Sequence, residues 1–165
     1  MAEQFDQLMI QIEEQKNAYQ TLLDLSRQKR EALIGQGEQS LDSLVEAEEK
    51  LLLYIGSLEK KRMQIASEVA KQGNMELEQL TLSTWPGLTD EDRDSIKAMQ
   101  QAFAEILGEL DTLNEVNSKL LKVQLDYVQD MMKHVTKISE STSYNAGGDV
   151  QSRKTQENKL IDAIL

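Results

Sequence analysis

The sequence lacks most of the residues on which small binding or catalytic sites are usually built. Its 165 residues include no cysteine, one proline and one histidine, and aromatic residues make up only 4%. Without cysteine the chain forms no disulfide and offers no thiolate to zinc. The single proline, Pro86, permits long helices on both sides of it. No apolar run approaches the ~18 residues of a membrane helix, so we expect no membrane insertion.

Groups that perform catalysis or bind metals are equally scarce. A carboxylate-bridged metal site in a helical bundle needs Glu-x-x-His pairs, but the lone His134 has Met131 three positions before it. The sequence contains no glycine-rich phosphate loop, and no nucleophile lies beside a base in a recognisable motif. We therefore expect a binding protein that is not an enzyme, with no catalytic residue, no metal site and no cofactor.

Negative charge dominates the composition. The formal net charge is −11 at pH 7, and the basic residues form only small clusters such as Lys60, Lys61 and Arg62. Phosphate backbones repel such a chain, so we expect no nucleic-acid partner. The polar, acidic stretch at residues 1–6 lacks the basic and apolar regions of a signal peptide, which leads us to expect a cytoplasmic location.

Three long stretches carry an apolar residue at every third or fourth position. This spacing predicts amphipathic helices over about 2–34, 38–71 and 90–140, with a loop at 72–89. The short glycine-containing break at 35–37 predicts an antiparallel hairpin between the first two helices. Thr89 and Asp92 have the spacing of a capping box at the start of the third. The predicted fold is all-α: an elongated antiparallel three-helix bundle or coiled coil over residues 1–140.

Several positions make more specific predictions about packing. Trp85, the only tryptophan, is expected to cap one end of the core. Polar residues interrupt the apolar stripes, where they either set helix register or lie at the stripe's edge; they are Glu48, Arg62, Asn117 and Gln124. Arg62 is expected to form an ion pair between helices, with Glu48 or Glu59 as its partner.

The third helix is expected to be the longest. At a rise of ~1.5 Å per residue it measures roughly 75 Å, against roughly 50 Å for each of the others. Its C-terminal part must then bend, fray, dimerise or bind a partner. Residues 141–165 are predicted to form a flexible tail, because 141–148 are small and polar. The tail ends in an amphipathic segment that either folds on a partner or docks on the bundle; its apolar residues are Leu160, Ile161, Ile164 and Leu165.

A set of short motifs in fixed order resembles the bacterial flagellar export chaperone family FlgN. The strongest lies in the third helix, at residues 114–121, with Leu125 and Tyr127 after it. The others agree in order and spacing; they are Tyr19-x-x-Leu22-Leu23-x-Leu25, Lys29 and Leu33, Leu44 with Glu46–Glu49, Leu58-Glu59-x-x-Arg62 and Tyr144-Asn145-Ala146-Gly147. The resemblance covers most of residues 5–148, while 149–165 match no pattern of the family.

The resemblance implies a cytosolic chaperone for the hook–filament junction proteins. Members of the family hold the terminal helices of these hook-associated proteins and dock them at the membrane protein of the export gate. We predict that cargo binds the C-terminal half of the third helix and the tail, through Leu120, Leu121, Leu125, Val128, Met131, Met132, Leu160, Ile161, Ile164 and Leu165. The resemblance also makes Tyr127 a candidate for contact with the export gate.

Two other functions stay open from the sequence. A structural coiled-coil protein would form a homo-oligomer through the third helix. A regulatory helical adaptor would bind a transcription factor or an enzyme that is never exported. For Leu120 and Leu121, burial inside the chain's own core is at least as plausible as cargo binding.

Overall fold

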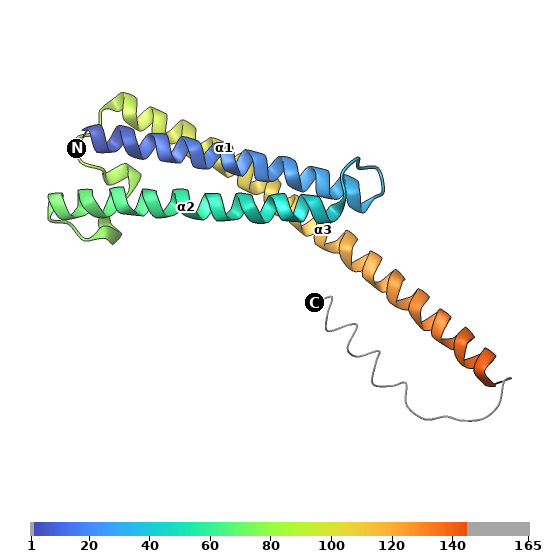
Figure 1. Cartoon of the computed structure of the whole chain (residues 1–165). Helices are drawn as coiled ribbons and strands as arrows, with labels where there is room; N and C mark the ends of the chain where they lie inside the picture. The colour runs from blue at the N-terminus through green and yellow to red at the C-terminus, as the bar shows by residue number, and fades with distance from the viewer. Residues whose placement is uncertain (1, 145–165) are drawn as a thin grey trace. The chain divides into compact units, whose positions relative to one another are not determined.

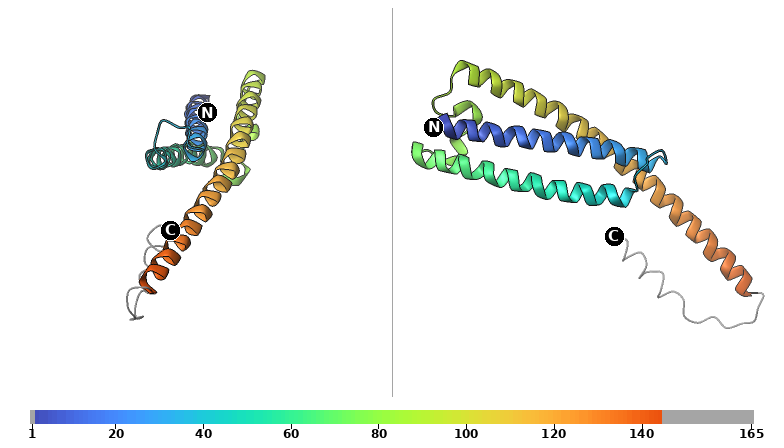
Figure 2. Two further views of the ribbon diagram at one scale, coloured as in Figure 1. Left: turned by 90° about the vertical axis from the view of Figure 1, so that its right-hand side faces the viewer. Right: turned by 45° about the horizontal axis from the view of Figure 1, so that its top comes forward.

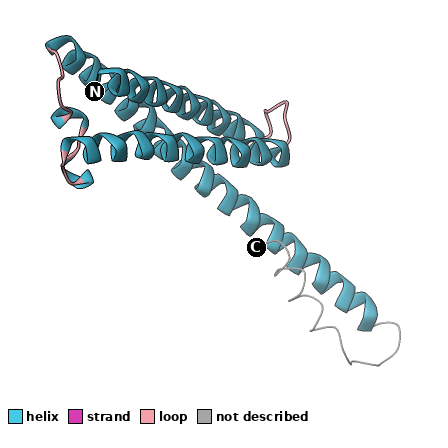
Figure 3. Cartoon of the chain, turned by 60° about the vertical axis from the view of Figure 1, so that its left-hand side comes forward, coloured by secondary structure: helices cyan, strands magenta, loops and turns pink. Residues whose placement is uncertain are grey.

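The chain is built from helices, as its sequence predicts. A computed structural model describes the backbone of residues 2–144 and the side chains of residues 3–138. Its α-helices are α1 (Ala2–Leu33), α2 (Leu41–Gly73) and α3 (Asp90–Tyr144), and two short 3-10 helices, η1 (Leu77–Gln79) and η2 (Leu82–Thr84), join α2 to α3 (Figure 1). No strand occurs among the described residues (Figure 3). The all-α class and the longer third helix are thus confirmed. Helix α3 continues through 141–144, the first residues of the predicted tail at 141–165, and the rest of that tail lies outside the described residues.

Contacts divide the chain into two compact units. The first unit comprises Met1–Lys122 and the second Val123–Leu165. The boundary falls inside α3. The described part of the second unit is therefore the last portion of one helix, and all tertiary packing described below belongs to the first unit.

In the first unit, α1 and α2 form an antiparallel hairpin (Figure 2). The turn begins with Gly35 at φ 76°, a left-handed conformation that glycine adopts without steric cost. Helix α2 then begins at Leu41, a few residues after the predicted start at 38. Ser40 caps it, because the Ser40 side chain accepts a hydrogen bond from the backbone N–H of Ser43. The cap explains the later start.

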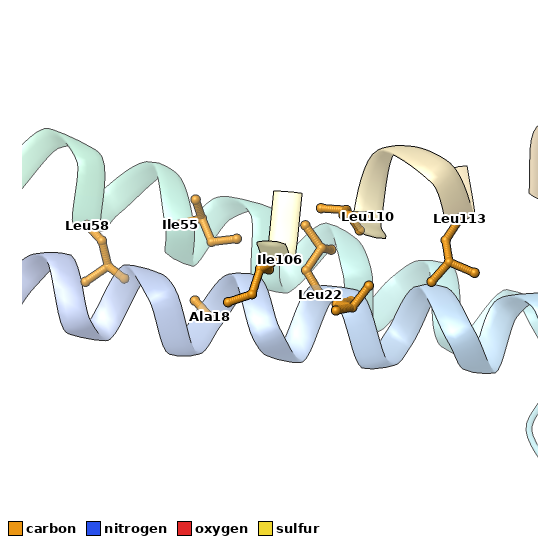
Figure 4. Close-up of a cluster of buried hydrophobic side chains, with 8 residues drawn as sticks. Ala18, Leu22, Ile55, Leu58, Ile106, Leu110 and Leu113 are labelled. Carbon is orange, nitrogen blue, oxygen red and sulfur yellow. The ribbon is translucent and has the colours of Figure 1, made fainter. Parts of the chain in front are cut away.

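Two apolar clusters hold the three helices of the first unit together. The middle cluster combines all three helices and is shown in Figure 4; it consists of Ala18, Leu22, Leu23, Ile55, Leu58, Ile106, Leu110 and Leu113. The end cluster includes Phe5, Val69 and Ile96 and surrounds the buried Trp85. Leu58 and Val69 have no exposed area. Trp85 thus caps the core as the sequence predicted, and Phe5 packs against its ring at a centroid distance of 6.1 Å.

The start of α3 is fixed by the predicted capping box. The Thr89 backbone N–H donates to the Asp92 carboxylate at 2.8 Å, and the Asp92 N–H donates to the Thr89 hydroxyl at 3.1 Å. The Thr89 hydroxyl also donates to the Asp92 carboxylate, at 2.7 Å. This hydrogen bond, followed by the one from the Thr89 backbone N–H, stabilises the charged carboxylate and lowers the pKa of Asp92. Both residues therefore satisfy donors that the first turn of the helix leaves free.

Polar side chains join the helices at defined points. Lys29 of α1 forms an ion pair with Glu48 of α2 at 2.7 Å, and both side chains are mostly buried. Gln15 of α1 donates to Glu59 of α2 at 2.8 Å. Arg62 donates to Glu59, one of its two predicted partners, but the pair lies within α2 and does not join two helices as predicted, because Glu59 is three residues earlier in the same helix.

Asn117 is the buried polar residue of the α3 stripe. Its Nδ2 donates to the backbone carbonyl of Ser26 in α1 at 2.9 Å. Ser26 has no exposed area, and Asn117 is buried as well. A hydrogen bond between buried polar groups tolerates little sliding, so this contact favours one register of α3 on α1. Gln124, one heptad later, is exposed.

Candidate functional site

Helix α3 keeps one seven-residue repeat through both units. We number its heptads so that position a holds Phe103, Leu110, Asn117, Gln124, Met131 and Ile138. In the first unit, position a and position d, represented by Ile106 and Leu113, face the α1–α2 hairpin. These two columns are sufficient to pack α3 on the hairpin, because both belong to the buried clusters. Position b in this part carries Lys97 and Asp111, so it belongs to the solvated side.

In the second unit the apolar positions of α3 are exposed. Six of them lie on one side of the helix, with exposed fractions between 42% and 62%. We call this surface the open face; it consists of Leu125, Val128, Met131, Met132, Val135 and Ile138. None of the described side chains from 123 to 138 is buried. A surface of this kind, with large apolar groups repeated at helical spacing, is typical of helix–helix recognition.

The structure places the predicted cargo residues in three different settings. Leu125, Val128, Met131 and Met132 belong to the open face. Leu121 is 43% exposed and Leu120 is half-buried, and both lie at the end of the first unit. The predicted second patch lies outside the described residues; it comprises Leu160, Ile161, Ile164 and Leu165. Four of the six residues of the first predicted cargo patch therefore lie together on the open face.

Two residues of the open face were left out of the predicted site. Val135 and Ile138 are among its most exposed members, at 62% and 60%. The signal for both was in the sequence, because they continue the same stripe at intervals of seven from Val128 and Met131. The prediction stopped at Met132, although the repeat does not.

Tyr127, the candidate for gate contact, lies beside the open face. Its side chain is 65% exposed, and it occupies position d, next to the column of Met131. His134 occupies the same column one heptad later and is also exposed. An exposed tyrosine combines a large apolar ring with a hydroxyl, which suits it to a protein interface. Tyr127 is thus available to a partner next to any helix bound on the open face.

Charges avoid the open face. Between 123 and 138 the charged residues occupy positions c and g, on the opposite side of the helix; they are Asp126, Asp130, Lys133 and Lys137. The positions that border the open face carry neutral polar side chains, such as Gln129. A partner that covers the open face therefore desolvates no charge, which removes a major cost of association.

The described residues offer little else that could form a site. Within 3–138 no group of three or more Asp, Glu or His side chains is arranged to hold a metal ion. A hollow of about 140 Å³ next to Trp85 is lined by loop and helix-start residues such as Pro86 and Leu88. No helix in the described part of the chain is long and apolar enough to cross a membrane. The open face is therefore the candidate site.

Comparison with known proteins points to one family. The model of the family described as FlgN protein matches residues 1–152. The match includes all three helices and the open face, and ends before the last apolar residues of the sequence. Neither the comparison with curated proteins nor the comparison with solved structures gave a match.

Proposed function

Because the chain belongs to the FlgN family, which consists of flagellar export chaperones, we propose that it is a cytoplasmic chaperone for hook-associated junction proteins. Chaperones of this family bind flagellar hook-associated proteins in general and are not enzymes. In this proposal the chain binds the terminal coiled-coil helices of its cargo, prevents premature assembly, and delivers the cargo to the flagellar type III export gate.

The observation that supports this proposal is the open face. Assembly through coiled-coil termini requires each cargo helix to carry an apolar stripe, which is liable to aggregate before export. The open face offers such a stripe an apolar surface with the same seven-residue repeat. Neither the binding nor the release of a helix at such a surface requires nucleotide chemistry.

The size of the open face sets a limit on the strength of binding. A fully buried large apolar side chain contributes about 1.5–3 kcal/mol, and roughly half of each side chain on the open face is still exposed. Six side chains then contribute on the order of 6 kcal/mol, and the partner contributes a similar amount. Association costs about 4–15 kcal/mol. The net affinity is therefore modest, as reversible delivery requires.

Two further contacts complete the proposed cycle. Tyr127 is proposed to contact the membrane protein of the export gate, since it stays exposed beside the open face. Competition at the gate would then release the cargo, because any ligand that prefers the free chaperone shifts the equilibrium towards it. The second cargo patch in the tail remains part of the proposal; it comprises Leu160, Ile161, Ile164 and Leu165.

Calorimetry with substituted chains tests the cargo site. The full-length chain is titrated with the C-terminal helical segment of a junction protein from the same bacterium. We expect saturable one-to-one binding that weakens at least about tenfold when Val128 and Val135 are both changed to Gln, because two central apolar contacts are lost. Val123→Gln is the matched control, because Val123 is 66% exposed on the opposite side of the same helix.

The other outcomes separate the alternatives. Unchanged affinity of the Val128→Gln and Val135→Gln double variant would move the cargo site to the first unit. A chain that ends at Ser143 and binds more weakly would place the tail in the site. No binding, together with a stable homo-oligomer, would favour the structural coiled-coil function. A stoichiometric partner that is never exported would favour the regulatory adaptor.

A further inference from the structure

We infer that the open face accommodates two partner helices side by side, presented as a helical pair, rather than a single helix. This inference rests on the proposed function and specifies the form in which cargo is recognised. It comes from the width of the open face, from the distribution of charge around α3, and from the way the first part of the same helix packs on the α1–α2 hairpin.

The open face is three columns wide. Val128 and Val135, at position e, form the central column. Met131 and Ile138, at position a, form one edge, and the column at position b forms the other edge. That third column consists of Leu125 and Met132. Each column repeats at an interval of seven, so the three run parallel along the helix. A two-stranded coiled coil uses two columns, and a wider stripe is typical of a helix that faces several others.

The width of the open face can be compared with the width of the buried surface in the first part of α3. There the columns at a and d suffice for burial against two helices, with contributions from Leu22 of α1 and Leu58 of α2. Position e contains Leu107 and Leu121, which are 44% and 43% exposed, and polar residues at its other places. In the first part of α3, two columns are enough to pack against both helices of the hairpin. A single partner helix would therefore leave at least one edge column of the open face exposed to water.

The distribution of charge agrees with a wide partner. From 124 to 138, positions a, b, d, e and f carry no charged side chain, and all charges lie at c and g. In the first part of α3, charges also occupy b and f, as Asp111 and Glu115 show. The uncharged surface is thus broader in the part of the helix that the chain's own core does not cover.

Other occupants cover less of this surface. The α3 helix of a second copy supplies one helix, which covers two columns. The apolar end of the chain's own sequence is a single short amphipathic segment, at residues 156–165. A pair of cargo helices covers all three columns and shields two aggregation-prone stripes at once. The methionines of the face, Met131 and Met132, have flexible side chains that adapt to different partner helices.

Three probes distinguish a helical pair from a single helix. They are the N-terminal helical segment of a junction protein, its C-terminal helical segment, and the two joined by a flexible linker. Each is titrated into the full-length chain by calorimetry. We expect the joined pair to bind one-to-one and at least about tenfold more tightly than either helix, because only the pair covers both edges.

Variants at each edge provide a second readout. One variant combines Met131→Gln with Ile138→Gln, and the other combines Leu125→Gln with Met132→Gln. Each is expected to weaken binding of the joined pair at least about fivefold, whereas Val123→Gln changes it less than about twofold. All five side chains are exposed, so circular dichroism of the unbound variants is expected to match that of the original chain.

The possible failures are distinguishable. If one helix alone binds as tightly as the joined pair, and one edge variant binds it normally, the two-helix inference is wrong while the proposed chaperone function stands. If none of the three probes binds, the proposed function is wrong as well. A dimer in sedimentation that both edge variants abolish would assign the face to a second copy of the chain.

Discussion

The two parts of helix α3 share one repeat but differ in what covers it. Up to Lys122 the apolar columns pack against α1 and α2, and Ile106 and Leu110 are buried. From Val123 the columns continue with Val128 and Val135, which are half or more exposed. The repeat alone therefore shows that α3 presents an apolar surface in both parts. Whether that surface is core or binding site depends on the length of the helices that pack against it.

This comparison implies that the two parts of α3 have different roles. Stability of the fold resides in the first unit, where the two apolar clusters and the interhelical polar contacts lie. The proposed binding site lies in the second unit, whose described side chains contribute little to stability because none is buried. Substitutions in the two regions should thus affect different measurements, and the following predictions run from the largest expected effect to the smallest.

Truncation of a core leucine is the most damaging change. Leu58→Ala removes a side chain with no exposed area and is expected to lower the free energy of unfolding by about 3 kcal/mol. Val128→Ala, in the open face, should change it by less than about 0.5 kcal/mol while weakening cargo binding. Urea denaturation measures the first effect and calorimetry the second. Equal destabilisation by both changes would contradict the division between the two regions.

Asn117 and Gln124 occupy position a in successive heptads, so they allow the two parts of α3 to be compared at one heptad position. Asn117→Ala removes the hydrogen bond to the Ser26 carbonyl and is expected to cost about 1–2 kcal/mol of unfolding free energy. Gln124→Ala, at the same heptad position in the next repeat, should cost less than about 0.5 kcal/mol because Gln124 is exposed. The two variants are compared by urea denaturation. A larger loss at Gln124 would show that the second part of α3 is also packed.

Loss of the N-cap tests whether the first turn of α3 supports the bundle. Thr89→Ala removes the hydroxyl that accepts from the Asp92 N–H, and is expected to cost about 1 kcal/mol. Thr89→Ser retains the hydroxyl and is the control. Thermal unfolding followed by circular dichroism should separate the two variants, while cargo affinity stays unchanged in both. A change in affinity would connect the helix start to the binding face.

The smallest expected effect concerns pH. The hydrogen bond from Arg62, together with that from Gln15, lowers the pKa of Glu59. A carboxyl group with a lowered pKa stabilises the folded chain above its unfolded pKa of ~4.3, and this contribution disappears as pH falls through the folded value. Glu59→Gln should therefore cost about 0.5 kcal/mol or less at pH 7, because the pair is partly exposed, and less than that at pH 3. Urea denaturation at both pH values measures it, and an equal cost at both would contradict this cause.

Much of the fold follows from local sequence signals. The apolar spacing predicts the three helices, and the Thr89–Asp92 capping box is confirmed by its hydrogen bonds. Composition and spacing alone do not predict which helix supplies the partner of a given side chain. Glu48 illustrates this limit, because its partner is Lys29 of α1, whereas Arg62 pairs with Glu59 of its own helix.

The candidate site could be predicted only in part, because the sequence does not show which residues the other helices cover. The stripe that contains Val128 and Met131 is visible in the sequence, but its exposure depends on where the first compact unit ends. Leu120 belongs to the same predicted stripe, yet it is half-buried, because it occupies position d, which faces the α1–α2 hairpin in the first unit. Val135 and Ile138 could have been included by following the repeat to its end.

Hydrogen exchange on the full-length chain tests the central claim most directly. Backbone amides are followed with and without the joined helical segments of a junction protein. The account predicts that exchange slows across residues 123–138, where the unbound helix has no buried side chains, and stays unchanged around Leu58. Slowed exchange confined to α1 and α2, with residues 123–138 unaffected by saturating cargo, would contradict it.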